Sequence, residues 1–413
     1  RRVGQRGQEH QGQDERAHLR TLPRAPYLDL SSSPWGMASE PRSGMAAVMR
    51  TATLIALLLT ACDGGASPDA GPDGRRDAAT ATDAGAVRDA STVRDAAAAL
   101  DAGGDDDAGL TADAGPADSG VSSRDPAAAG PLAVDASRSE TLDRGGRSIP
   151  ITVHMPAGDG RVPLVLLLPG FQVSSAQYTT LANRVASHGF VVVRAEPEEG
   201  EGFVPNPDHV EMAGDGRAVI DWAIGNLAGR VDPERVGVMG HSLGGKLAFM
   251  IAAGDPRVDA IFGVDPVNGG GGPGMGYTTT RPDIVPELVE RLTVPIGLPG
   301  ELFSSTGGGG FSMACAPADQ NYQTFYDAAT ASPWVVQWTL EGADHMDFVD
   351  DRASCGTACS VCAAGPADPA SVRDATATLA AAFFLRHLAS DAAMDAWLTG
   401  ASVPPIAADR SMR

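Results

Sequence analysis

The sequence predicts an α/β domain with a mostly parallel, doubly wound sheet and helices on both of its faces. Two observations lead to this prediction. From about residue 137 onward, apolar runs of strand length alternate with stretches of helical character, an alternation typical of parallel sheets. In addition, a Gly-x-Ser-x-Gly motif at residues 240–244 lies between an apolar run and a helical stretch, which indicates a sharp turn from a strand into a helix.

Several elements precede the motif. Residues 148–155 alternate between polar and apolar side chains, which predicts an early antiparallel strand. Residues 162–168 are apolar throughout, as expected of a central parallel strand that is covered on both faces. We expect a helix over 178–188, a strand over 190–195, and a helix over 214–227 whose apolar side chains share one face.

The remaining elements follow the motif. Residues 260–264 and 334–340 are rich in apolar and β-branched side chains, and both stretches predict strands. A further apolar run at 294–298 lies between them. The stretch 371–388 predicts a long helix that completes the covering of the sheet.

Ser242 lies at the centre of the motif, and the flanking strand and helix make it the nucleophile elbow of an α/β-hydrolase. Glycines flank such a serine because side chains at their positions would collide with the neighbouring strand and helix. The N-terminus of the helix also presents N–H groups to a developing oxyanion. We predict Ser242 as the nucleophile, with the backbone N–H groups of Leu243 and Phe171 as oxyanion donors.

A serine nucleophile needs a base and an orienting acid, which in this fold follow it in the order acid, then histidine. His345 is predicted as the base because it follows a strand downstream of Ser242. Asp265 is the favoured acid, since it lies at the carboxyl end of the strand after the elbow helix, where catalytic groups gather. Glu301, after the next apolar run, is the alternative acid.

Taken together, these motifs resemble chlorophyllases and the related platelet-activating-factor acetylhydrolase-like and polyester hydrolases. The resemblance implies ester hydrolysis, and it implies Ser242, Asp265 and His345 as the triad, because family members carry the acid in a motif like Val264-Asp265-Pro266. Plant members usually have His where this chain has Pro169, and Arg where it has Leu243. The likeness is carried by the segments 169–171, 186–190, 240–246, 263–267 and 344–347.

These residues predict a serine carboxylic-ester hydrolase that forms an acyl-enzyme and needs neither a metal nor an organic cofactor. We expect a small-molecule or polymeric ester as the substrate, and a monomeric protein. Two alternatives stay open. One is acyl transfer to an alcohol on the same triad, and the other is a non-catalytic, surface-exposed module that retains the hydrolase fold.

The N-terminal third predicts export and lipid anchoring. A basic residue and a short apolar run precede Leu59-Thr60-Ala61-Cys62, which resembles a bacterial lipobox. We therefore expect a lipoprotein signal peptide at 45–61, a lipidated Cys62 that anchors the protein to a membrane, and a bacterial cell-envelope location at the outer membrane or periplasmic face. An ordinary cleaved signal is the alternative, and residues 1–44 are interpreted as upstream sequence without a function.

Residues 62–136 predict a disordered tether between the anchor and the catalytic domain, which we place at 137–413. Asp, Ala and Gly dominate this segment, and Asp63 to Glu140 hold 16 acidic and 6 basic residues, a net charge of −10. So few large apolar side chains cannot offset the entropy of ordering. The whole chain carries a net charge of −21, which argues against nucleic acid and anionic membrane surfaces as partners.

The four remaining cysteines, Cys315, Cys355, Cys359 and Cys362, predict two disulfides in an exported domain. Sequence alone leaves three possible pairings. The spacing of the last three is also compatible with a metal site, which we keep as the alternative. Because the last three cysteines follow His345 closely, we expect the pairing to brace the histidine loop.

Overall fold

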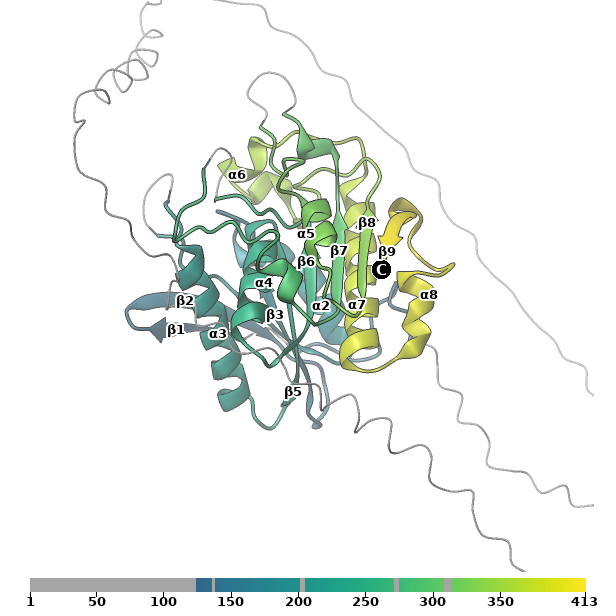
Figure 1. Cartoon of the computed structure of the whole chain (residues 1–413). Helices are drawn as coiled ribbons and strands as arrows, with labels where there is room; N and C mark the ends of the chain where they lie inside the picture. Colours follow the sequence, from purple (N-terminus) through teal and green to yellow (C-terminus); the bar gives the residue numbers. More distant parts are fainter. Residues whose placement is uncertain (1–123, 136–137, 201–204, 271–274, 308–312) are drawn as a thin grey trace, which may run out of the picture. The chain divides into compact units, whose positions relative to one another are not determined.

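The computed structural model of the chain describes residues 124–135, 138–200, 205–270, 275–307 and 313–413 (Figure 1). The predicted upstream segment, signal peptide and Cys62 lie outside the described residues, as does most of the predicted tether.

One nine-stranded sheet organises the described residues, and its strand order is β1-β2-β4-β3-β5-β6-β7-β8-β9. The neighbours from β4 to β8 pair in parallel, whereas β1 with β2, β2 with β4, and β8 with β9 pair antiparallel. This confirms the predicted mostly parallel sheet with an early antiparallel strand. The strands are β1 (Arg138–Arg144), β2 (Arg147–His154), β3 (Val162–Leu168), β4 (Val191–Ala195), β5 (Val231–His241), β6 (Val258–Val264), β7 (Ile296–Gly300), β8 (Val335–Thr339) and β9 (Asp409–Met412).

Helices cover both faces of the sheet, as predicted (Figure 1). Helices α2 and α7 pack together on one face, whereas α3 and α4 pack together on the other face, where α5 also joins the core. None of the described helices combines the length and the hydropathy that crossing a membrane requires. The helices are α2 (Thr179–Ser187), α3 (His209–Asn226), α4 (Leu243–Gly254), α5 (Tyr322–Ala328), α6 (Thr357–Ser360), α7 (Pro369–Leu388) and α8 (Asp395–Leu398).

Strand β3 shows why its sequence is apolar at every position. Leu164, Leu166 and Leu168 belong to the core beneath α3 and α4, and Val165 and Leu167 belong to the core beneath α2 and α7. Successive side chains of a strand point to opposite faces of the sheet. A central strand covered on both faces therefore has no position left for a polar side chain.

Helix α3 begins earlier than the predicted boundary at residue 214. The Asp208 side chain accepts hydrogen bonds from the N–H groups of Val210 and Glu211, both at 3.0 Å. This cap satisfies N–H groups that have no partner within a helix. The helix therefore begins at His209, at a capping residue rather than at the first run of apolar side chains.

The folded domain also begins before the predicted boundary at 137. Within residues 124–135, the Gly130 N–H donates to Ser187 Oγ at 2.8 Å, and the Leu132 N–H donates to Ser187 O at 3.1 Å. Arg184 Nη1 donates to Ala127 O at 2.7 Å. These contacts are made by backbone atoms of the 124–135 segment. The predicted boundary rested on side-chain composition, which does not show backbone hydrogen bonds.

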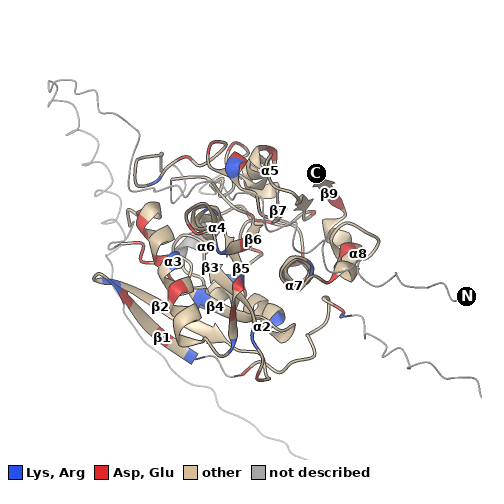
Figure 2. Cartoon of the chain, turned by 60° about the horizontal axis from the view of Figure 1, so that its bottom comes forward, with Lys and Arg blue, Asp and Glu red and all other residues tan. Residues whose placement is uncertain are grey.

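A buried carboxylate joins α3 to the hairpin of β1 and β2. Asp215 is 0% exposed, and it accepts hydrogen bonds from Arg144 Nε at 2.7 Å and from Arg147 Nη2 at 2.5 Å. Arg144 also pairs with the exposed Glu211 at 2.5 Å. Charged residues of both signs accordingly gather where α3 lies beside this hairpin (Figure 2).

We expect Asp215→Ala to lower the free energy of unfolding by about 3–5 kcal/mol. The substitution removes the buried carboxylate, and Arg144 and Arg147 both lose their ion pair with it. Glu211→Ala is the matched control on the same arginine, and its exposed pair should contribute only about 0–1 kcal/mol. Chemical denaturation of both variants measures the difference. Equal losses in the two variants would contradict this account of the cluster.

Candidate active site

Ser242 lies at the sharp turn between β5 and α4, where the sequence motif predicted it. Its backbone has φ 55° and ψ −119°, a conformation that non-glycine residues rarely adopt. A Cβ atom at Gly240 would lie 2.3 Å from the carbonyl carbon of Gly244, and one at Gly244 would lie 2.4 Å from the carbonyl oxygen of Leu168. Both positions therefore require glycine, and their close contacts hold the serine in its strained conformation.

The three predicted triad residues form one hydrogen-bonded chain. His345 Nε2 lies 2.9 Å from Ser242 Oγ, and His345 Nδ1 lies 2.6 Å from Asp265 Oδ2. Asp265 and His345 are both buried. A carboxylate that accepts the Nδ1–H leaves the Nε2 lone pair free to accept the serine proton. The arrangement is therefore chemically suited to nucleophilic catalysis by Ser242.

Asp265 reaches the histidine from the first position after β6. Its backbone is left-handed, with φ 41°, and its N–H donates to the Pro299 carbonyl at 2.7 Å. Glu301, the alternative acid, lies beside this pair, but its Oε2 accepts instead from the Ser304 N–H at 2.8 Å. Of the two predicted acids, Asp265 is the one hydrogen-bonded to His345.

A buried tyrosine joins the elbow to the loop after β3. The Tyr178 hydroxyl accepts from the Gly170 N–H at 3.2 Å and lies 2.8 Å from His241 Nδ1. Burial lowers the pKa of His241 well below its usual range, so Nδ1 of the neutral imidazole accepts a hydrogen bond from the Tyr178 hydroxyl. The predicted oxyanion donors lie on the two segments that this tyrosine joins: Phe171 follows Gly170, and Leu243 is the first residue of α4.

Lys246, in the first turns of α4, is a site residue to which sequence analysis assigned no role. Its Nζ donates to three backbone carbonyls, those of Asn268 at 2.9 Å, Gly269 at 3.0 Å and Pro282 at 2.6 Å. Burial lowers its pKa to about 7. The available signal was its position four residues after Ser242, together with its being the only lysine in the chain. It attaches the segment after Asp265 to the elbow helix.

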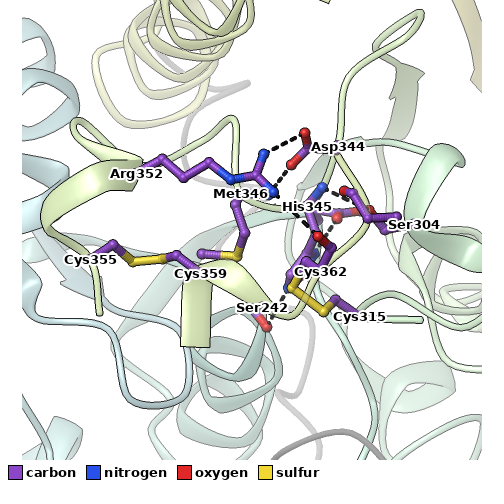
Figure 3. The surroundings of a disulfide bond; sticks show 12 residues. Ser242, Ser304, Cys315, Asp344, His345, Met346, Arg352, Cys355, Cys359 and Cys362 are labelled. Carbon is purple, nitrogen blue, oxygen red and sulfur yellow. Dashed lines mark hydrogen bonds and ion pairs between the residues drawn. A yellow bond between two sulfur atoms is a disulfide. The ribbon is translucent and has the colours of Figure 1, made fainter. Parts of the chain in front are cut away.

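The histidine loop is held by its own acidic neighbour. Asp344 Oδ2 accepts from Arg352 Nη1 and from the Gly365 N–H, both at 2.7 Å, and Oδ1 accepts from the Met346 N–H at 2.8 Å. Figure 3 shows Arg352 reaching across to Asp344, next to His345. No pattern in the sequence indicates this role of Asp344, because Arg352 reaches the carboxylate only through the fold of the loop.

The four cysteines form two disulfides, Cys315–Cys362 and Cys355–Cys359 (Figure 3). The sequence prediction of two bridges is therefore confirmed, and the metal alternative for these cysteines is not. The Cys315–Cys362 bridge spans 47 residues and encloses β8 and His345. The other bridge closes a separation of only four residues.

Asp265, Glu301 and His345 offer ligand atoms that all lie within 4.8 Å of one another, a spacing that a metal ion could use. Two features make this a poor donor set. His345 Nδ1 and Asp265 are already joined by a hydrogen bond. Burial and the neighbouring Asp265 also raise the pKa of Glu301, which disfavours the ionised form that would bind a cation. Hard cations prefer several charged oxygen ligands, and a raised pKa of Glu301 works against a second charged oxygen ligand beside Asp265.

We expect the double variant Cys315→Ser/Cys362→Ser to lose about 4 kcal/mol of unfolding free energy, because the bridge closes a long loop in the unfolded chain. The matched control is Cys355→Ser/Cys359→Ser. It removes a bridge that closes a loop of only four residues, so it should lose about 2 kcal/mol of unfolding free energy. Denaturant titration of both variants compares them. A larger loss in the control would show that loop length does not determine the contribution of these bridges.

The chain matches the model of a protein family described as Chlorophyllase over residues 127–412. Chlorophyllase-1 of Arabidopsis thaliana is 31% identical over 222 residues, which is 49% of this chain and 64% of that relative. Chlorophyllase-1, chloroplastic, of Citrus sinensis is 28% identical over 215 residues, covering 50% and 61% of the two chains. The chain thus spans slightly less than two thirds of these relatives.

A second group of relatives matches a shorter part of the chain. Cutinase 2 of Thermobifida cellulosilytica is 29% identical over 119 residues, which is 28% of this chain and 44% of that protein.

The match to the chlorophyllase family model begins at residue 127, close to the start of the folded domain in the structure.

Proposed function

The chain belongs to the chlorophyllase family, and on that premise we propose that it is a serine carboxylic-ester hydrolase with Ser242, His345 and Asp265 as its triad. The observation that carries the proposal is the unbroken chain from Ser242 Oγ to His345 Nε2 at 2.9 Å and from His345 Nδ1 to Asp265 Oδ2 at 2.6 Å. A nucleophile, a base within hydrogen-bond reach and an orienting acid are the parts that acyl transfer requires.

The proposed reaction begins when Ser242 Oγ attacks the ester carbonyl carbon while His345 Nε2 takes the serine proton. The negative charge that develops on the carbonyl oxygen is stabilised by the N–H groups of Phe171 and Leu243. The bond to the alcohol oxygen then breaks, and His345 returns the proton to that oxygen. Water attacks the acyl-enzyme with His345 again as the base, and the carboxylic acid leaves as Ser242 regains its proton.

Asp265 has two parts in this scheme. It fixes the imidazole so that Nδ1 carries the proton and Nε2 is the base, and it stabilises the imidazolium that forms during the reaction. Its buried position strengthens this interaction because little water screens it. The proposed substrates are small-molecule or polymeric esters, since the relatives include proteins named chlorophyllases and cutinases.

We expect Ser242→Ala and His345→Ala to reduce hydrolysis of p-nitrophenyl esters to background, and Asp265→Asn to reduce kcat by about 10⁴-fold because the wrong tautomer is favoured. The free energy of unfolding of each variant is measured alongside. A fluorophosphonate probe should label the wild-type protein at Ser242 only. Absence of labelling and of ester hydrolysis would favour the non-catalytic module, and near-normal activity of Asp265→Asn would exclude Asp265 as the acid.

We also propose that the protein is lipid-anchored at Cys62, at a bacterial cell envelope, with the acidic segment as a tether. The support is the sequence pattern alone: a basic residue, a short apolar run and Leu59-Thr60-Ala61-Cys62. Each buried methylene contributes about 0.8 kcal/mol to membrane binding, and two or more acyl chains give stable anchoring. A lipidated cysteine of this kind would hold the hydrolase at the membrane surface.

We expect metabolic labelling with a fatty-acid analogue to mark the wild-type protein and not Cys62→Ser, which should lose its partition with membranes. The specific activity of the folded domain should be the same in both proteins, because Cys62 lies far before it in the sequence. An unlabelled wild-type protein would contradict the anchoring proposal and leave the proposed hydrolase unaffected.

A further inference from the structure

Glu301 is a buried carboxyl group at the site that the proposed mechanism does not use. It follows β7 directly and is 0% exposed. Its Oε2 accepts from the Ser304 N–H at 2.8 Å, whereas its Oε1 is buried without a hydrogen-bond partner among the described residues. Its backbone N–H donates to Asp265 Oδ1 at 3.2 Å. A single residue thus contacts the proposed acid through its backbone and Ser304 through its side chain.

Ser304 extends this contact to the histidine. Its hydroxyl oxygen accepts from the backbone N–H of His345 at 3.1 Å, and the hydroxyl lies 3.5 Å from the Ala363 carbonyl, to which it donates. Figure 3 shows Ser304 beside His345, on the side away from Cys355 and Cys359. Asp265 therefore holds the imidazole ring, Ser304 holds the backbone of the same histidine, and Glu301 connects the two.

The titratable groups around Glu301 come from three directions. Asp265 faces it from the end of β6, His345 from the loop after β8, and Tyr322 from α5. The Tyr322 hydroxyl is engaged with Thr339 Oγ1 at 2.7 Å, and no basic side chain pairs with Glu301 among the described residues. Two ionised carboxylates at this spacing, out of contact with water, would repel each other strongly. Burial and Asp265 accordingly raise the pKa of Glu301 to about 9, although hydrogen bonds from Ser304 and Phe303 act in the opposite direction.

We propose that Glu301 is a positioning residue whose neutral carboxyl group holds Ser304, and through it the backbone of His345, while Asp265 remains the only carboxylate at the imidazole. The proposal rests on the proposed hydrolase function for its kinetic consequences. The neutral state of Glu301, however, is a property of the folded protein that is measured without any substrate.

The first test compares two substitutions of similar size at one position. Glu301→Gln keeps an uncharged acceptor for the Ser304 N–H, so kcat should stay close to that of the wild type. Glu301→Leu leaves that N–H unsatisfied and loosens the histidine backbone, and it should lower kcat by about 10–100-fold with little change in KM, since small displacements of a base are costly. Ser304→Ala should lower kcat by a similar factor. The double variant Glu301→Leu/Ser304→Ala should lower kcat little more than either single variant does, because both substitutions disrupt the same contact to His345.

The second test uses the pH dependence of unfolding. Glutamate in an unfolded chain has its ordinary pKa of 4.5, whereas burial and Asp265 raise the pKa of Glu301 in the folded protein to about 9. Above the lower value the unfolded state binds fewer protons, so the stability of the wild type should fall as pH rises from about 4.5 to about 9. Burial also raises the pKa of Glu199 to about 7 and that of Asp347 to about 6, and both contribute to the fall in either protein. Glu301→Gln should remove only the part that Glu301 contributes. The denaturation midpoint should therefore decrease less between pH 5 and pH 8 in Glu301→Gln than in the wild type.

The outcomes distinguish a failure of the proposed role of Glu301 from a failure of the proposed hydrolase function. An equal loss of kcat in Glu301→Gln and Glu301→Leu would overturn the neutral positioning role, as would an unchanged kcat in Glu301→Leu. Identical pH dependence of unfolding in the wild type and Glu301→Gln would show that Glu301 is already ionised and would also overturn it. A wild-type protein that neither hydrolyses esters nor reacts with a fluorophosphonate would refute the hydrolase function, while the unfolding experiment would still test the protonation of Glu301.

Discussion

The backbone at Ser242 is forced into a left-handed conformation by the close approach of α4 to β5 and β3. This approach is possible only because Gly240 and Gly244 have no side chains where the neighbouring backbone lies within 2.4 Å of a Cβ position. The strained turn places the serine hydroxyl at the carboxyl edge of the sheet and directs the N-terminus of α4 toward the same place. Every other part of the site is arranged with respect to this turn.

The parallel sheet supplies the remaining groups because the carboxyl ends of β6, β7 and β8 meet at one edge. Asp265, Glu301 and His345 each follow one of these strands, and their polar atoms converge within 4.8 Å. Two carboxyl groups in so small a buried volume cannot both be ionised at low cost. The protein hydrogen-bonds Asp265 to the imidazole and leaves Glu301 in an environment that favours its proton.

The loop that carries His345 is held by hydrogen bonds, an ion pair and a disulfide. Asp344 accepts three hydrogen bonds from its own loop and from Arg352 and Gly365, and a disulfide closes the segment around it. A general base must keep its position within a fraction of an ångström to remain effective. Covalent and ionic bracing of a loop is a physical means of achieving that precision, since loops are otherwise the more mobile parts of a fold.

The sequence was enough to predict most strands and helices in their order, the elbow, and Ser242 and His345 as two members of the hydrogen-bonded chain, because these depend on local periodicity, on glycines at fixed spacing and on chain order. It left open whether Asp265 or Glu301 is bonded to His345, how the four cysteines pair, and how Ser304, Asp344 and Lys246 take part. Those points were decided by the tertiary structure, since each depends on the distance between atoms that are far apart in sequence and meet only where the strands end together.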